Sequence, residues 1–303
     1  MDKKVIVILG PTATHKSDFA IKLAEEFSIE IISADSMQFY KGMDIGTAKI
    51  PKELRKKIPH HMIDIIDISE EYSIADYKKQ CIEVSNGIYE RKHIPLLVGG
   101  SGLYIRTITE NFPVEKGIKD DLLREELSKL STDELRMLAT ECDPVRTQII
   151  GKNDRKRLIR IIEYYREAKR QMSQIQNPLP PFKFLKIGLI KERGKLYEDI
   201  DKRVDRMIEL GLVEEVKKLK AEYNQWSKTA SQAIGYKEII AYLDGKISLD
   251  EAIRLIKQHT RNLAKRQITW FKKEKAVIWV DVEEFDKAYT EVKRLVGEFL
   301  NEN

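Results

Sequence analysis

An apolar run near the N-terminus passes directly into a loop that begins with glycine. The run covers residues 5–9, and the loop continues as Gly10-Pro11-Thr12-Ala13-Thr14-His15-Lys16-Ser17. In α/β proteins, the phosphate-binding loop has the pattern G-x-x-x-x-G-K-[ST] and lies between a buried strand and a helix. Backbone N–H groups, a Lys and a hydroxyl there surround a diphosphate. The pattern predicts a parallel α/β core with a diphosphate site.

One position departs from this pattern, since His15 stands where the second Gly is expected. Glycine is favoured there because the backbone is left-handed and a phosphate approaches it closely. Histidine tolerates the left-handed region better than most residues and can itself donate to a phosphate. The residues expected to hold the diphosphate are Gly10, Thr12, Ala13, Thr14, His15, Lys16 and Ser17, and the Ser17 hydroxyl is expected to bind Mg²⁺.

The order of apolar and helical segments predicts how the chain is divided. Apolar segments at 4–9, 30–33, 61–68 and 94–98 alternate with helical patterns at 17–27 and 74–91, which is typical of a parallel sheet with crossover helices. Residues 113–181 instead read as charged helices, after which a strand pattern resumes at 184–190. We therefore predict a P-loop NTPase-like α/β core of residues 1–112 and 182–303 with a helical insertion domain at 113–181.

Beyond the insertion, helical patterns predominate. They cover residues 195–222, 231–243 and 249–273, followed by a short strand at 276–280 and a last helix at 284–300. We expect these helices to complete the core.

The strand pattern at 94–98 lacks an acidic residue. It ends in Gly99-Gly100, whereas a nucleotide triphosphatase places a carboxylate on a neighbouring strand for its metal and water. The first strand-end carboxylate after the loop is Asp35. An Asp after a strand is often a turn or helix cap. Beside a bound diphosphate and an amine, it would also serve as a general base.

Positive charge is concentrated in two stretches of this 303-residue chain, whose formal net charge is +5. Residues 154–170 hold seven basic and three acidic residues, and residues 254–275 hold eight basic residues and one acidic residue. One such run is usually a solvated helix face, but two favour a nucleic-acid partner, especially with Trp270 and Phe271 between the cations. Packing of these rings in the core is the alternative.

Other functional classes find little support. Cys81 and Cys142 are far apart and match no C-x-x-C pattern, so neither a disulfide framework nor a Cys zinc site is expected. No apolar run approaches the roughly 20 residues of a bilayer span, and no signal peptide pattern is present. We expect a cytoplasmic monomer without membrane contact.

Five motifs in order resemble the tRNA dimethylallyltransferase family. They are Gly10-Pro11-Thr12-Ala13 with Lys16-Ser17, then residues 35–38 (DSMQ), 42–49 (GMDIGTAK), 99–104 (GGSGLY) and 265–270 (KRQITW). Together they cover essentially the whole chain, and five in sequence are far more specific than any one. The resemblance implies a prenyltransferase that moves a dimethylallyl group from dimethylallyl diphosphate to N6 of adenosine 37 in tRNAs reading UNN codons. The products are N6-(dimethylallyl)adenosine and diphosphate.

The resemblance also implies roles for single residues. Asp35 corresponds to the base that takes the N6 proton, Ser101 to a hydroxyl contact where the family commonly has Thr, and Arg203 to a diphosphate contact. From the residues alone, Arg203 also fits an exposed position on a charged helix. The residues that the resemblance implies for binding tRNA at its anticodon stem-loop are Asp35, Ser36, Met37, Gln38, Arg124, Lys156, Arg157, Arg160, Gln232, Gly235, Lys237, Lys265, Arg266, Gln267 and Trp270.

Two other classes of protein fit part of the sequence. An isopentenyltransferase acting on free adenine nucleotides, or a small-molecule P-loop kinase, would use the same loop but needs no extended cationic surface. A non-catalytic RNA-binding protein would keep the basic stretches, and His15 in the loop keeps this alternative open. Salt-sensitive tRNA binding tests the first alternative, and prenyl transfer tests the second.

Overall fold

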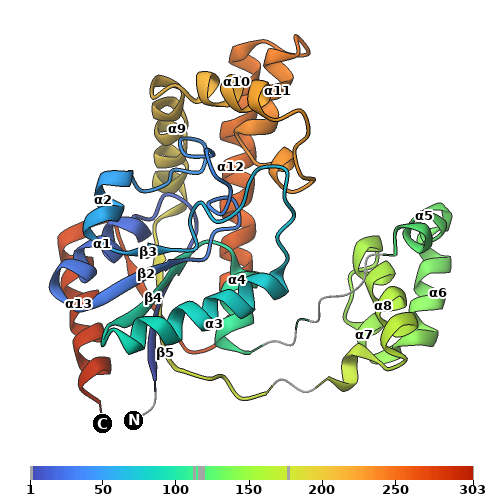
Figure 1. Ribbon diagram of the computed structural model, residues 1–303, viewed down its shortest axis with the longest axis horizontal. Helices are drawn as coiled ribbons and strands as arrows, with labels where there is room; N and C mark the ends of the chain where they lie inside the picture. Colours follow the sequence, from blue (N-terminus) through green and yellow to red (C-terminus); the bar gives the residue numbers. More distant parts are fainter. Residues whose placement is uncertain (1–2, 112–113, 115–119, 176–177, 303) are drawn as a thin grey trace. The chain divides into compact units, whose positions relative to one another are not determined.

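The computed structural model describes residues 3–111, 114, 120–175 and 178–302. The chain forms two compact units (Figure 1). The first combines Met1–Thr109 with Pro180–Asn303, and the second is Glu110–Leu179.

The first unit is built on a single sheet. Its strands are all parallel and lie in the order β3-β2-β4-β1-β5-β6. They are β1 (Lys4–Leu9), β2 (Ile29–Ser33), β3 (His60–His61), β4 (Ile94–Gly99), β5 (Lys183–Ile190) and β6 (Val277–Asp281). The predicted P-loop NTPase-like parallel sheet is confirmed. Because β4 lies between β1 and β2, the loops after these three strands meet at one edge of the sheet.

Both faces of the sheet are buried by helices. Along β1, Val5, Val7 and Leu9 belong to one core cluster while Ile6 and Ile8 belong to the other, as the period of two requires. Helices α1 (Lys16–Glu26) and α13 (Phe285–Asn301) cover one face, and α3 (Ile74–Glu90) and α4 (Gly102–Thr109) cover the opposite one (Figure 1).

The apolar segment 61–68 forms less strand than expected. Only His60–His61 pairs with β2, because Met62 and Asp64 adopt positive φ angles of 61° and 55° and turn the chain away. Asp64 then accepts hydrogen bonds from Lys49 and Arg55, which holds this turn beside the short helix α2 (Lys52–Lys57).

The C-terminal helices are shorter than the patterns suggested. The helical segment 195–222 divides into α9 (Arg193–Glu209) and α10 (Leu212–Glu222), because Gly211 has φ 97° and ends the first helix. A 3₁₀ turn at Ala230–Gln232 precedes α11 (Tyr236–Leu243), and α12 (Leu249–Phe271) follows as the longest helix of the described chain. No helix in these described ranges is long and apolar enough to cross a membrane.

The second unit is helical and has its own core. It contains α5 (Asp121–Lys129), α6 (Thr132–Cys142), α7 (Pro144–Gln148) and α8 (Arg155–Ala168), followed by a 3₁₀ turn at Met172–Gln174. Leu123, Leu135 and Leu158 lie at its centre. Two arginines stabilise this unit through hydrogen bonds to backbone carbonyls. Arg155 donates to the carbonyls of Ser128 and Leu130 at the end of α5, and Arg136 donates to the carbonyls of Gly151 and Lys152 after α7.

Candidate active site

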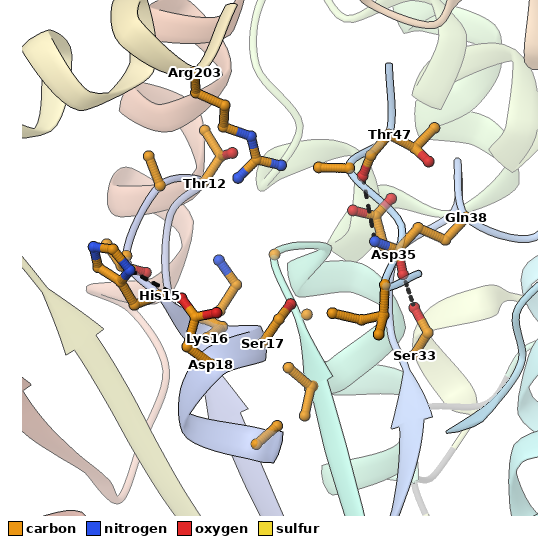
Figure 2. Close-up of a pocket in the computed structure, with 18 of the residues that line it drawn as sticks. Thr12, His15, Lys16, Ser17, Asp18, Ser33, Asp35, Gln38, Thr47 and Arg203 are labelled. Atoms are coloured by element: carbon orange, nitrogen blue, oxygen red, sulfur yellow. Dashed lines mark hydrogen bonds and ion pairs between the residues drawn. The ribbon is translucent and has the colours of Figure 1, made fainter. Parts of the chain in front are cut away.

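A cavity of about 590 Å³ lies at the carboxyl ends of β1, β2 and β4. Its walls come from the loop before α1, the segment after β2, Gly99 and Gly100 at the carboxyl end of β4, and one face each of α9 and α12. Figure 2 shows Lys16 and Arg203 on one side and Asp35 and Gln38 on the other. This is the edge at which parallel α/β sheets bind ligands.

The phosphate-binding loop has the backbone that its motif demands. Ala13 and His15 have φ angles of 62° and 58°, in the left-handed region, and Gly10 has φ 149°. A Cβ at Gly10 would overlap the Leu189 carbonyl, so this glycine allows the turn and does not itself line the cavity. Thr14 is fully buried, and its hydroxyl donates a hydrogen bond to the Pro11 carbonyl. Only the backbone of Thr14 therefore remains available to a ligand.

The side chain of His15 lies at the margin of the loop. Its ring nitrogen Nδ1 is 2.9 Å from Oδ2 of Asp18 (Figure 2). The ring packs edge-on against Phe285 of α13, with 5.9 Å between the ring centroids. Histidine therefore replaces glycine at the cost of a left-handed backbone, about 1–2 kcal/mol, and His15 is one of the residues that line the cavity. The departure from the motif is compatible with a working diphosphate site.

Two partly buried cations, Lys16 and Arg203, line this space. Burial, followed by the charge of Arg203, lowers the pKa of Lys16 to about 7, while Asp35 opposes that shift. Burial also lowers the pKa of Arg203, which reaches into the cavity from α9. Burying cations is unfavourable unless an anion compensates for the lost water, so this wall is suited to a diphosphate.

Asp35 acts both as a turn cap and as a cavity residue. Its Oδ1 accepts from the backbone N–H of Met37 at 3.0 Å. Burial raises the pKa of the Asp35 carboxyl, although the Met37 N–H and the charges of Lys16, Arg203 and Lys49 oppose the shift. A carboxylate with a raised pKa is a better proton acceptor at neutral pH than an ordinary aspartate.

The residues after Asp35 separate into two kinds. Gln38 lines the cavity, with its Oε1 accepting from Ser33 Oγ at 2.9 Å and its Nε2 donating to the Thr47 carbonyl at 3.3 Å. Ser36 and Met37 do not line it, and Met37 packs against the core instead. Of the segment 36–38, only Gln38 is therefore placed to meet a ligand in this cavity.

The end of β4 is empty of side chains for a packing reason. A Cβ at Gly99 would overlap the carbonyl of Ala34, and a Cβ at Gly100 would overlap the amide of Gln267. Because β4 lies between β1 and β2, these glycines keep the space between Lys16 and Asp35 open. Ser101 differs from the expectation: its backbone N–H donates to Ala34 and the residue precedes α4 without lining the cavity.

Gln267 lines the cavity and Trp270 packs against the core. The Gln267 side chain accepts from the backbone N–H of Thr12 at 2.9 Å and donates to the Gly100 carbonyl at 3.0 Å, so its amide is engaged inside the protein. Trp270 packs so closely on α4 that a Cβ at Gly102 would overlap its ring. The core-packing alternative holds for Trp270, and for the fully buried Phe271 as well.

The other residues expected to contact tRNA are either exposed or engaged within the protein. Exposed residues are Lys156, Arg157, Gln232, Lys265 and Arg266, and Arg160 is half-buried. Arg124 forms a two-pronged ion pair with the buried Glu163, which uses its guanidinium within the second unit. Gly235 is buried in a turn with φ 93°, and Lys237 lies 3.6 Å from the carboxylate of Glu238.

Sequence reasoning missed several residues of the cavity. His60, Thr47, Lys191, Lys202 and Arg206 line it as well. The spacing of Arg206 three residues after Arg203 placed both on one face of a helix, and this signal was available in the sequence. Thr47 and Lys191 lie in loops, His60 lies in β3 and Lys202 in α9, and their place at the cavity depends on the tertiary fold.

The described residues hold no cluster of three or more His, Cys, Asp or Glu side chains that would bind a metal by itself. Ser17 lines the cavity at the first turn of α1. One hydroxyl, completed by diphosphate oxygens and water, is a ligand set that Mg²⁺ accepts. The residues present therefore fit a metal that arrives with its substrate.

The fold and the cavity define a P-loop type of transferase, in which the phosphate loop faces a carboxylate and the neighbouring strand carries no hydrolytic acid. The family model described as IPP transferase matches residues 38–274. The chain belongs to this family.

Individual relatives agree over nearly the whole length. A tRNA dimethylallyltransferase of Halothermothrix orenii is 44% identical over 98% of this chain and 93% of its own. The solved tRNA isopentenylpyrophosphate transferase of Bacillus halodurans is 37% identical with a TM-score of 0.74, covering 99% of this chain and 97% of that one. A eukaryotic dimethylallyltransferase solved acting on tRNA is 31% identical with a TM-score of 0.86, covering 98% of this chain and 79% of that one.

Proposed function

We propose that this protein transfers the dimethylallyl group of dimethylallyl diphosphate to N6 of adenosine 37 in tRNAs that read UNN codons. The observation that carries the proposal is that the partly buried cations Lys16 and Arg203 face the partly buried carboxylate of Asp35 across one cavity (Figure 2). We further propose that it acts in the cytoplasm and as a monomer.

The diphosphate occupies the loop side of the cavity. Backbone N–H groups of residues 13–17, at the N-terminus of α1, point toward an anion there, and Lys16 and Arg203 supply charge. In the transfer, the C–O bond between the dimethylallyl carbon and the diphosphate breaks, and the electron pair leaves with the diphosphate. These cations stabilise the charge that develops on the leaving oxygen.

The adenine occupies the Asp35 side. Its N6 forms the new C–N bond, and Asp35 takes the proton that N6 loses, so that atoms and charge balance. The N6 group is inaccessible in a stacked loop, so the nucleotide must flip into the cavity, where the Gln38 amide lies within reach of a base. An adenine amine is a weak nucleophile, which makes close alignment of both substrates important.

Mg²⁺ is the divalent ion that we propose as the cofactor. The Ser17 hydroxyl would hold it, and it would neutralise charge on the diphosphate oxygens.

The tRNA contacts are proposed for the exposed cations and for the half-buried Arg160. Lys156, Arg157 and Arg160 on α8 and Lys265 and Arg266 on α12 would contact phosphates of the anticodon stem-loop. Gln232 and Lys237 would add polar contacts near α11. Arg124 is better explained by its pair with Glu163.

Incubation with labelled dimethylallyl diphosphate and unmodified tRNA tests the proposal. Labelled N6-(dimethylallyl)adenosine should be recovered from position 37 after digestion to nucleosides. Free adenine nucleotide in place of tRNA is the matched control and should accept no label. Transfer to the free nucleotide alone, or binding of tRNA without transfer, would contradict the proposal and favour one of the alternative classes.

A further inference from the structure

The carboxylate of Glu215 holds a loop that belongs to a different part of the chain. Glu215 lies in the first turn of α10, and its Oε2 accepts from the backbone N–H groups of Asp44 at 3.1 Å and Ile45 at 2.8 Å. Its Oε1 accepts from the N–H of Gly46 at 3.3 Å. Three successive backbone N–H groups that converge on one anion form a nest. Here the protein's own side chain fills that nest.

Tyr236 fixes the carboxylate in turn. Its hydroxyl donates to Glu215 Oε1 at 2.6 Å, and its ring is fully buried. The ring lies so close to the loop that a Cβ at Gly46 would overlap it. The loop therefore rests on Tyr236 by packing and on Glu215 by hydrogen bonds.

The same loop forms one wall of the cavity. Thr47 and Ala48 line it directly after the residues that Glu215 binds. The Thr47 carbonyl accepts from the Gln38 amide at 3.3 Å, and the backbone N–H of Gln38 donates to the Asp35 carbonyl at 3.2 Å. Neither Glu215 nor Tyr236 lines the cavity, so any effect on the reaction must pass through this chain of contacts.

We propose that Glu215, held by Tyr236, is a positioning residue for the tRNA adenine. It sets the Thr47 carbonyl against Gln38 and so orients the amide beside Asp35. The phosphate-binding loop is held by a separate contact, from the Thr12 N–H to Gln267. This inference rests on the proposed function and adds to it the prediction that Glu215 affects one substrate and not the other.

The test compares Glu215→Ala with Glu214→Ala, its exposed neighbour on the same helix. For Glu215→Ala we expect kcat/KM for tRNA to fall about 10- to 100-fold, as for small displacements of a reacting group. The Kd for dimethylallyl diphosphate, measured by calorimetry without tRNA, should stay within about twofold of the wild type. Glu214→Ala should match the wild type in both measurements. Glu215→Gln and Tyr236→Phe should show the same selective loss at smaller size, and they carry the test if Glu215→Ala does not fold.

If Glu215→Ala lowered kcat/KM for tRNA and the affinity for dimethylallyl diphosphate by equal factors, Glu215 would give only general structural support, and the inference would be overturned. An unchanged kcat/KM for tRNA would also overturn it. Absence of turnover in the wild type would overturn the proposed function and this inference with it. That failure is distinct from a loss seen only in the variants.

Discussion

The side-chain amide of Gln267 joins the backbone N–H of Thr12 to the carbonyl of Gly100, at 2.9 and 3.0 Å. Thr12 belongs to the phosphate-binding loop, and Gly100 directly follows β4. Through Gln267, α12 therefore links these two segments of the cavity wall. A residue in a basic, aromatic segment thereby acts on the diphosphate side of the site.

Replacing Gln267 with Ala should loosen this tie. We expect the Kd for dimethylallyl diphosphate to rise about tenfold, because one backbone N–H and one carbonyl lose their partner, a loss of about 1–2 kcal/mol. Gln258→Ala, an exposed glutamine on the same helix, is the control. If calorimetry on Gln267→Ala finds an unchanged Kd for dimethylallyl diphosphate together with weaker tRNA binding, Gln267 contacts tRNA directly.

Asp35→Asn should remove the base and preserve the shape of the side chain. General bases contribute about 10²- to 10⁴-fold, so kcat should fall by at least about 10²-fold. The Kd for tRNA should change little, since phosphate contacts dominate the affinity. Single-turnover transfer and filter binding measure the two quantities. A large loss of tRNA affinity would instead make Asp35 a recognition residue.

The pKa of Lys16 predicts a basic limb in the pH profile. Burial and Arg203 lower this pKa to about 7, so the free enzyme loses the ammonium proton as the pH rises through about 7. Because a diphosphate prefers the protonated form, kcat/KM for dimethylallyl diphosphate should decrease above that pH. When dimethylallyl diphosphate is saturating, the bound anion raises the pKa of Lys16 again. The value of kcat should therefore stay constant to a higher pH than kcat/KM. Lys16→Arg should abolish the limb, since a guanidinium stays protonated; a limb that persists in this variant has another origin.

His15→Gly should leave catalysis nearly unchanged. The ring lies against Asp18 and Phe285, and glycine adopts the left-handed backbone without strain. We expect kcat within about twofold, because the ring contacts Asp18 and Phe285 and neither of these has a role in the proposed transfer. A gain of tenfold or more in kcat would show that the ring obstructs the diphosphate.

Arg124 and Lys156 should respond differently to replacement by Ala. Lys156→Ala should weaken tRNA binding and reduce the slope of log K against log salt by about 0.7–0.9, as for one lost phosphate contact. Arg124→Ala should leave that slope alone and destabilise the protein by about 1–3 kcal/mol, because Glu163 is left buried without its partner. Salt titrations and thermal unfolding separate the two effects. The reverse pattern would restore Arg124 as a tRNA contact.

Local patterns in the sequence determined most of the fold and the centre of the site. Apolar runs bounded by loops predicted the strands, and the loop of Gly10 to Ser17 with Asp35 predicted which ends would meet, because carboxyl ends of parallel strands share one edge. The turn at Asp35, whose carboxylate accepts from the Met37 N–H, follows from the same short-range chemistry.

Only the tertiary structure decided where long side chains are used. Gln267 meets Thr12 across 255 residues, Glu215 meets Asp44 across 171, and Arg124 meets Glu163 across 39. A charged or amide side chain has the same sequence signature whether it faces RNA, a buried carboxylate or a backbone N–H. Which partner it finds depends on helix packing, because the free energy of each hydrogen bond depends on what else is buried beside it.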